Sequence, residues 1–355
     1  MTMLAEVIDA VIGIDTHRDR HEVEIADPAG KPITTMQVGN DSGGFARLLA
    51  AIAQVAPGPR VAVCIEGTRS YGIGLARALA AAGLLVIECE PPRRKQRRGK
   101  GKSDPIDAHL AVLAALRLDT ARLPVPRADG DREALRILLV ARQEMTVAAT
   151  AQASRLRALL LAGDDADRRA ARTTLSKTAL AALAGRELPA GAGRELAIRQ
   201  AEMRRLALAV GQARHQLKDN RAQLLAIAED IAPGLTSRYG VGPVTAAQAI
   251  VSFSHPGRCR SEAAFAALGG TSPIPASSGQ TIRHRLNRGG DRALNRAIHA
   301  IAPTRMRSCP RTRAYLARRT AEGKTRREIR RCLKRYIARE LYRQLNRSMK
   351  PLTSP

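Results

Sequence analysis

The order of short extended and helical segments near the N-terminus constrains the fold of this chain more than any other feature. Apolar or alternating runs between turn residues are typical of strands, and longer periodic runs after a capping residue are typical of helices. The predicted strands are residues 11–15, 21–26, 32–38, 60–65 and 84–89. The predicted helices are residues 45–53, 71–82 and 104–116, with Asp41 or Ser42 capping the first and Ser103 or Asp104 beginning the last.

Tight turns join the first three predicted strands, whereas a helix separates the later strands from one another. Strands joined by short turns pair antiparallel, and strands joined through a helix pair in parallel. Three antiparallel strands followed by α/β crossovers are the order of a ribonuclease-H-like sheet. We therefore expect residues 8–118 to form an α/β domain of that type.

The rest of the chain is predicted to be mainly helical. Residues 131–232 are rich in Ala, Leu and Arg, and apolar residues between 196 and 224 recur near heptad spacing. Breaks at residues 163–165 and 189–193 predict an antiparallel helical hairpin or a coiled-coil dimerisation arm. Residues 233–347 form a third unit, which ends in a very basic helical stretch from residue 305.

The net charge of +27 indicates a polyanionic partner, because such an excess of like charge repels itself in a compact fold. Nucleic acid fits best, since Lys and Arg that neutralise phosphates release counterions. An anionic membrane surface is the alternative, but no basic helix carrying Trp or Phe is visible. Aromatic residues make up only 2% of the chain, so we expect it to bind nucleic acid mostly through contacts of Arg with phosphate rather than by stacking on bases.

Four acids are the candidate catalytic residues. Asp15 and Glu66 each end an apolar strand, and Asp104 and Asp107 are spaced to share one face of a helix. Two strand ends and one helix can bring four carboxylates together, and such hard oxygen ligands suit Mg²⁺ or Mn²⁺. Singly, each acid is as well explained as a turn residue or a helix cap.

Other motifs point to phosphate contacts. Gly240-Val241-Gly242-Pro243 fits a helix-hairpin-helix turn, although an ordinary helix-helix turn has the same pattern. Ser277-Ser278-Gly279 offers an exposed hydroxyl ahead of several arginines, although such a triplet is also common in plain loops. The predicted nucleic-acid contacts are Arg93, Arg94, Lys95, Arg97, Arg98, Lys100, Lys102, Gly240, Gly242, Arg283, Arg285, Arg288, Arg326, Arg327, Arg330 and Arg331.

The remaining titratable residues suggest supporting roles. His17, His21 and His109 lie near the acids in sequence but form no metal-ligand spacing, so we expect structural or supporting roles. The five cysteines are scattered and never form a CxxC pair, which favours reduced thiols of a cytosolic protein. No signal-like or bilayer-spanning apolar run is visible.

The motifs in their order resemble the bacterial insertion-sequence transposases of the DEDD type, which are bridge-RNA-guided serine recombinases. The resemblance rests on Ile12-Gly13-Ile14-Asp15-Thr16, Cys64-Ile65-Glu66-Gly67-Thr68, Tyr71-Gly72, Lys102-Ser103-Asp104-Pro105-Ile106-Asp107-Ala108, Tyr239-Gly240-Val241-Gly242-Pro243-Val244-Thr245-Ala246, Phe265-Ala266-Ala267-Leu268-Gly269-Gly270, residues 273–279 and Asn287-Arg288-Gly289-Gly290-Asp291-Arg292-Ala293-Leu294.

This resemblance implies a mechanism and partners. It implies a RuvC-like N-terminal domain that holds Mg²⁺ or Mn²⁺ at the four acids, and a C-terminal transposase domain that supplies a serine nucleophile. Counting from Pro273 selects Ser278, with Ser277 as the alternative, for a phosphoserine link to DNA. It further implies donor and target DNA, a structured guide RNA, a homodimer or homotetramer, and a cytoplasmic, nucleoid-associated location in bacteria.

Two other functions fit the same sequence. A RuvC-like junction endonuclease would use the four acids and water, and would need no serine. A basic coiled-coil protein that binds nucleic acid without catalysis would need neither. Substituting the acids should abolish activity in either enzyme and change nothing in the non-catalytic binding protein. Substituting the serines should inactivate the transposase but not the junction endonuclease.

Overall fold

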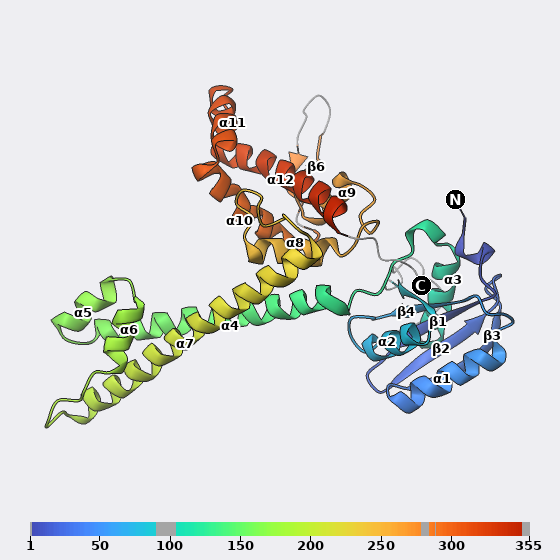
Figure 1. Ribbon diagram of the computed structural model, residues 1–355, viewed down its shortest axis with the longest axis horizontal. Helices are drawn as coiled ribbons and strands as arrows, with labels where there is room; N and C mark the ends of the chain where they lie inside the picture. Colours follow the sequence, from blue (N-terminus) through green and yellow to red (C-terminus); the bar gives the residue numbers. More distant parts are fainter. Residues whose placement is uncertain (1, 90–103, 278–283, 288, 350–355) are drawn as a thin grey trace. The chain divides into compact units, whose positions relative to one another are not determined.

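Figure 1 shows the computed structural model, which describes residues 2–89, 104–277, 284–287 and 289–349. The chain divides into two compact units. The first contains Met1–Glu133, Phe253–Phe265 and Leu345–Pro355. The second contains Ala134–Ser252 and Ala266–Gln344. The first is a mixed α/β unit and the second is largely helical.

A five-stranded sheet forms the centre of the first unit (Figure 1). Its strands are β1 (Ala10–Thr16), β2 (Arg20–Ala26), β3 (Pro32–Gly39), β4 (Val61–Glu66) and β5 (Leu85–Cys89). They lie in the order β3-β2-β1-β4-β5. The first three pair antiparallel, and β4 and β5 continue in parallel from β1. The predicted pairing directions are therefore confirmed, and the predicted strand ends differ from the observed ones by at most one residue.

Helices cover both faces of this sheet, because alternate side chains of each strand point to opposite faces. Helices α1 (Ser42–Val55) and α2 (Ile73–Ala81) pack on the face that holds Ile14 and Ile65. Helix α3 (Asp104–Leu116) packs on the opposite face. Short 3-10 turns lie at Leu4–Glu6 and Thr120–Arg122.

Gly13 allows α3 to lie very close to β1. A Cβ atom at this position would sit 2.1 Å from the Ala108 carbonyl oxygen and 2.8 Å from the side chain of Val112. Real Cβ atoms are not found at such distances, so a side chain here would push the helix away from the sheet. The glycine therefore fixes where the first turns of α3 stand over β1.

Two long helices of the second unit form an antiparallel hairpin, α4 (Gly130–Leu161) and α7 (Arg194–Ile231). Arg142 donates to the Leu217 carbonyl at 2.9 Å, and the Asn220 amide donates to the Leu138 carbonyl at 2.9 Å. These cross-links join the two helices within one chain. Of the two predicted arrangements, the hairpin is the one described. Helices α5 (Asp165–Arg172) and α6 (Lys177–Ala184) pack with both long helices in one apolar cluster.

The C-terminal part is mainly helical. It contains α8 (Pro243–Phe253), α9 (Glu262–Leu268), β6 (Ile274–Pro275), β7 (His284–Arg285), α10 (Arg292–Ser308), α11 (Pro310–Ala321) and α12 (Arg326–Ser348). None of the helices in the described ranges is long and apolar enough to cross a membrane.

The very basic stretch predicted from residue 305 is helical, as expected, and is divided among several helices. It consists of the end of α10 followed by α11 and α12, which are separated by a turn in which Gly323 has a φ of +78°. Helix α12 also has an apolar stripe, since Ile329, Leu333, Ile337 and Leu341 recur every four residues and are buried. The charged residues of α12 therefore do not surround the whole helix, and its apolar face packs against other parts of the protein.

Candidate active site

Asp15 and Glu66 stand side by side at the ends of neighbouring strands. Ile14 pairs with Ile65 in the parallel β1–β4 register, so the next residues are Asp15 and Glu66. Alternation places both on the face covered by α3, opposite the face of Ile14 and Ile65. The Thr16 hydroxyl donates to the Glu66 carbonyl at 2.7 Å and ties the two strand ends together. Two of the predicted acids are thus brought to one place by strand pairing.

Helix α3 places the other two acids above the same strands. Asp107 is buried, with 5% of its surface exposed, and its neighbour Ala108 is the residue that meets Gly13. Asp104 is the first residue of α3, and its side chain lies outside the described part. The face of α3 formed by Ala108 and Val112 includes position 104, because residues four apart share one helix face.

Two further carboxylates, which sequence reasoning missed, lie on this face of the sheet. Glu22 is opposite Asp15 in the antiparallel β1–β2 register, and Glu24 is opposite Gly13. Nδ1 of His109 lies 2.7 Å from the Glu24 carboxylate, and Nδ1 of His17 lies 3.9 Å from that of Asp15. The signal was available, since polar residues alternate along β2 and antiparallel pairing aligns them with the polar position in β1.

The donor set fits a hard divalent cation in kind, because every predicted ligand is a carboxylate. Asp15 and Asp107 are both buried, and buried carboxylates need a counter-charge or hydrogen bonds. Among the described side chains, no group of three or more His, Cys, Asp or Glu is arranged to hold a metal ion. Asp15, Glu66 and Asp107 of the predicted set are described, so by themselves they do not form such a group. The side chain of Asp104, the fourth predicted ligand, lies outside the described part.

Arginines surround Glu88 at the end of β5, and this feature was not predicted. Arg127 forms a two-pronged hydrogen bond with the Glu88 carboxylate, and Nε of Arg69 lies 3.5 Å from it. Burial alone would raise the pKa of Glu88, but the hydrogen bonds and charges of these arginines outweigh it and lower the pKa. The acid is therefore kept ionised in a largely buried position.

The same cluster holds two further arginines and a histidine. Burial, with the charge of Arg127 nearby, lowers the pKa of Arg132 to about 10. Burial also lowers the pKa of Arg258, and the pKa of His255 falls to about 4 because of burial and the adjacent Arg258. These residues are far apart in sequence, so no local motif could have revealed the cluster.

His255 should make stability depend on pH. Its folded pKa of about 4 lies below the ordinary value of 6.5, so between these values the unfolded chain binds a proton that the folded chain does not. Stability contributed by the neutral imidazole is therefore lost as pH falls from about 6.5 toward about 4. When the pH is lowered from about 7 to about 5, the free energy of unfolding of His255→Asn should fall less than that of the wild type. Urea unfolding at each pH measures it. Equal losses would contradict this.

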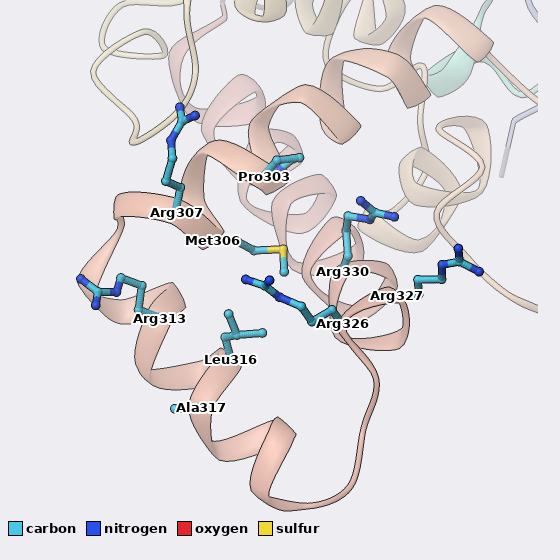
Figure 2. A pocket seen from close by; sticks show the side chains of 9 residues that line it. All are labelled: Pro303, Met306, Arg307, Arg313, Leu316, Ala317, Arg326, Arg327 and Arg330. Carbon is cyan, nitrogen blue, oxygen red and sulfur yellow. The ribbon is translucent and has the colours of Figure 1, made fainter.

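A basic hollow of about 970 Å³ is formed by α10, α11 and α12. Figure 2 shows the side chains that line it. Its apolar lining consists of Pro303, Met306, Leu316 and Ala317, and its basic lining consists of Arg307, Arg313, Arg326, Arg327 and Arg330. Arg326 extends toward Met306, whereas Arg307 and Arg327 extend outward (Figure 2). No acid is among its described lining residues. Three of the predicted nucleic-acid contacts are thus brought to one hollow, and Arg331 is exposed on the same helix.

The predicted helix-hairpin-helix turn packs against α10. Gly240 has a φ of +77°, and a Cβ there would contact Ile301 and Arg305 at 3.4 Å. The Gly242 amide donates to the Thr245 hydroxyl at 3.0 Å, so this amide already has a hydrogen-bond acceptor within the turn. The positive φ of Gly240, which residues other than glycine rarely adopt, therefore explains this glycine. A phosphate contact by either glycine stays a prediction.

Part of the predicted site lies outside the described residues. Ser277 is exposed after β6, and Arg285 is exposed in β7, where it pairs with Ile274. The predicted residues outside the described part are Arg93, Arg94, Lys95, Arg97, Arg98, Lys100, Lys102, Ser278, Arg283 and Arg288.

Comparisons with known proteins agree with these features. A family model described as "Transposase", of the DEDD type of IS110, matches residues 12–162. A second, described as "Transposase IS116/IS110/IS902 family", matches residues 232–317. The "Insertion element IS110 uncharacterized 43.6 kDa protein" of Streptomyces coelicolor is 26% identical over 367 residues, which is 90% of each chain. The "Mini-circle putative transposase for IS117" of the same organism is 27% identical over 164 residues, which is 44% of this chain and 39% of that protein.

Proposed function

Because this chain belongs to the IS116/IS110/IS902 family of DEDD transposases, enzymes that cut and join DNA, we propose that residues 8–118 form a RuvC-like catalytic domain. The DEDD type implies dependence on a divalent metal. We assign its ligands to Asp15, Glu66, Asp104 and Asp107, and the ion to Mg²⁺ or Mn²⁺. The observation that carries this proposal is the adjacency of Asp15 and Glu66 beneath the first turns of α3.

The strand order supports a RuvC-like or ribonuclease-H-like fold, since three antiparallel strands are followed by two parallel ones. A divalent ion held by these carboxylates would activate the attacking oxygen and stabilise the leaving oxygen of a phosphodiester. The chain's own residues set the geometry. The bond from Thr16 to the Glu66 carbonyl fixes the strand ends, and the contact of Ala108 with Gly13 fixes α3.

A serine nucleophile completes the proposed reaction. Oγ of Ser278, or of Ser277, attacks a DNA phosphorus, a new Oγ–P bond forms, and the P–O bond to the leaving strand breaks. The serine proton is lost and the leaving oxygen gains a proton. Arg283, Arg285 and Arg288 would neutralise the phosphate, and exposed Ser277 and Arg285 are the described members of this set.

We expect Ser278→Ala to abolish the covalent protein–DNA adduct while leaving DNA binding intact, because alanine has no oxygen to join phosphorus. The measurement is gel analysis, under denaturing conditions, of protein linked to end-labelled donor DNA. Ser277→Ala is the matched control and should still form the adduct. If the adduct persists in both variants and in the double variant, the serine mechanism is wrong and hydrolysis by a junction nuclease becomes the better account.

The other regions receive proposed roles on the same basis. We assign dimerisation or tetramer assembly to the helical segment 131–232, and DNA and guide-RNA binding to the C-terminal transposase domain 233–347. The basic hollow of Figure 2 supports nucleic-acid binding by that domain. Strand exchange that requires an added structured RNA supports guidance, and exchange by RNA-free protein at the same rate contradicts it.

A further inference from the structure

A second basic hollow, of about 890 Å³, lies in the largely helical unit on another side of α11. Thr312 and Tyr315 of α11 line it, whereas Arg313 and Leu316 line the hollow of Figure 2. Other lining residues of the hollow come from α10, from α12 and from Arg238. The two hollows therefore use different residues of one helix.

Two tyrosines stand together in this second hollow, although aromatic residues are scarce in the chain. Tyr315 and Tyr336 form an edge-to-face pair with ring centroids 5.8 Å apart. The Arg318 guanidinium lies 5.6 Å from the centre of the Tyr315 ring. Tyr336 remains 52% exposed, so part of a large ring is left facing solvent. Burial raises the pKa of Tyr315 further above the ordinary value of 10, so this phenol is uncharged at neutral pH.

The charge of the hollow selects a polyanion. Its arginines are Arg238, Arg305, Arg311, Arg318, Arg339 and Arg343. Glu340 is the acid among its described lining residues, and Arg305 already binds its carboxylate at 2.7 Å. An exposed ring beside an arginine-rich rim is the combination by which proteins stack a base and neutralise its phosphates.

We propose that this hollow receives an unpaired nucleotide, with its base stacked on Tyr336 and its flanking phosphates neutralised by the surrounding arginines. A paired base is stacked inside its duplex and does not present a face to a side chain. The inference rests on the proposed nucleic-acid binding by residues 233–347 and makes it more specific. It also adds base stacking on a tyrosine to the phosphate contacts by arginine that the sequence predicts.

The test uses short RNA and DNA hairpins that carry one 5-iodo-pyrimidine, placed either in the loop or in the stem. On irradiation of the full-length protein, we expect the loop probe to cross-link to Tyr336 and the stem probe not to do so. Mapping the linked peptide by mass spectrometry gives the answer without any variant. Cross-linking of the RNA loop, the DNA loop or both assigns the source of the nucleotide. Absence of any cross-link to Tyr336 or Tyr315 overturns the inference.

Affinity of the unmodified loop probe gives a second measurement. Tyr336→Leu should weaken binding by roughly 5- to 150-fold, which is the usual effect of losing one stacked base. Tyr336→Phe keeps the ring and is the matched control, with affinity expected near that of the wild type. Unchanged loop binding in Tyr336→Leu overturns the inference and leaves the proposed function standing. If the wild type binds none of the hairpins, both this inference and the proposed nucleic-acid binding by residues 233–347 are wrong.

An acidic peptide is the competing polyanion, and poly-glutamate is its probe. If poly-glutamate binds more tightly than the RNA and DNA loops, and if Tyr336→Leu abolishes that binding, the hollow is a protein-docking site and the nucleotide assignment is wrong. Displacement of poly-glutamate by the loop hairpins, but not by fully paired duplexes, supports the assignment.

Discussion

Asp15→Asn should lower the rate of DNA strand cleavage by more than about 100-fold. Substituting a residue that only supports a metal ligand usually costs less than this. Asparagine keeps the size of the side chain but removes a charged oxygen donor beside Glu66. The fold should remain, because the apolar residues of β1 are unchanged. Cleavage of end-labelled donor DNA, measured at saturating Mg²⁺ and again at saturating Mn²⁺, checks the prediction.

Asp19→Asn is the matched control for charge. Asp19 follows β1 closely in sequence, but its side chain is 72% exposed and pairs with Arg18. Loss of this surface ion pair should cost little stability and leave cleavage near the wild-type rate. Equal losses of cleavage in Asp15→Asn and Asp19→Asn would show that general charge near β1, rather than a specific ligand, supports cleavage.

Gly13→Ala should cause the second large loss, although the variant changes no charged group. The new methyl group would meet the Ala108 carbonyl at 2.1 Å, and a backbone atom cannot turn aside as a flexible side chain does. Helix α3 must then shift with Asp104 and Asp107. We expect a stability loss of about 1–3 kcal/mol from overpacking. We also expect a loss of cleavage of about 100-fold, because misplacement by about 1 Å has effects of that size.

Gly211→Ala is the control for a glycine substitution. Gly211 lies inside α7, and a Cβ there would meet nothing within 4 Å. Alanine should therefore stabilise the helix by about 0.5–1 kcal/mol and leave cleavage unchanged. Urea unfolding and the same cleavage assay compare the two variants. If Gly13→Ala proves as stable and as active as the wild type, α3 does not lie against β1 as the structure describes.

The sheet and the positions of Asp15 and Glu66 were predictable because they depend on local patterns. Short apolar runs identify strands, and the end of a run places the acid at the edge of a sheet. The helix that begins at Asp104 was predictable for the same reason, since its apolar periodicity follows a capping residue. These are the parts of the candidate site that depend on sequence-local interactions.

Features that depend on distant residues were not predictable. Glu22 and Glu24 reach the site only through the register of β2 on β1. Heptad spacing in α7 did not distinguish pairing within the chain from pairing with a second copy. Within the chain, hydrogen bonds from Arg142 and Asn220 and a shared apolar cluster join α7 to α4. The arginines around Glu88 likewise come from separate segments, so only the folded chain brings them together.

Binding of Mn²⁺ to the full-length protein tests the central claim most directly, because it requires neither DNA nor the serine. Electron paramagnetic resonance of the free ion, during titration of the protein, gives the number of ions bound and their affinity. We expect the wild type and Asp19→Asn to bind Mn²⁺ alike. We expect the Asp15→Asn/Asp107→Asn double variant to lose that binding while its circular dichroism spectrum shows that it is still folded. Equal binding by the double variant and the wild type would contradict the assignment of the metal to these carboxylates.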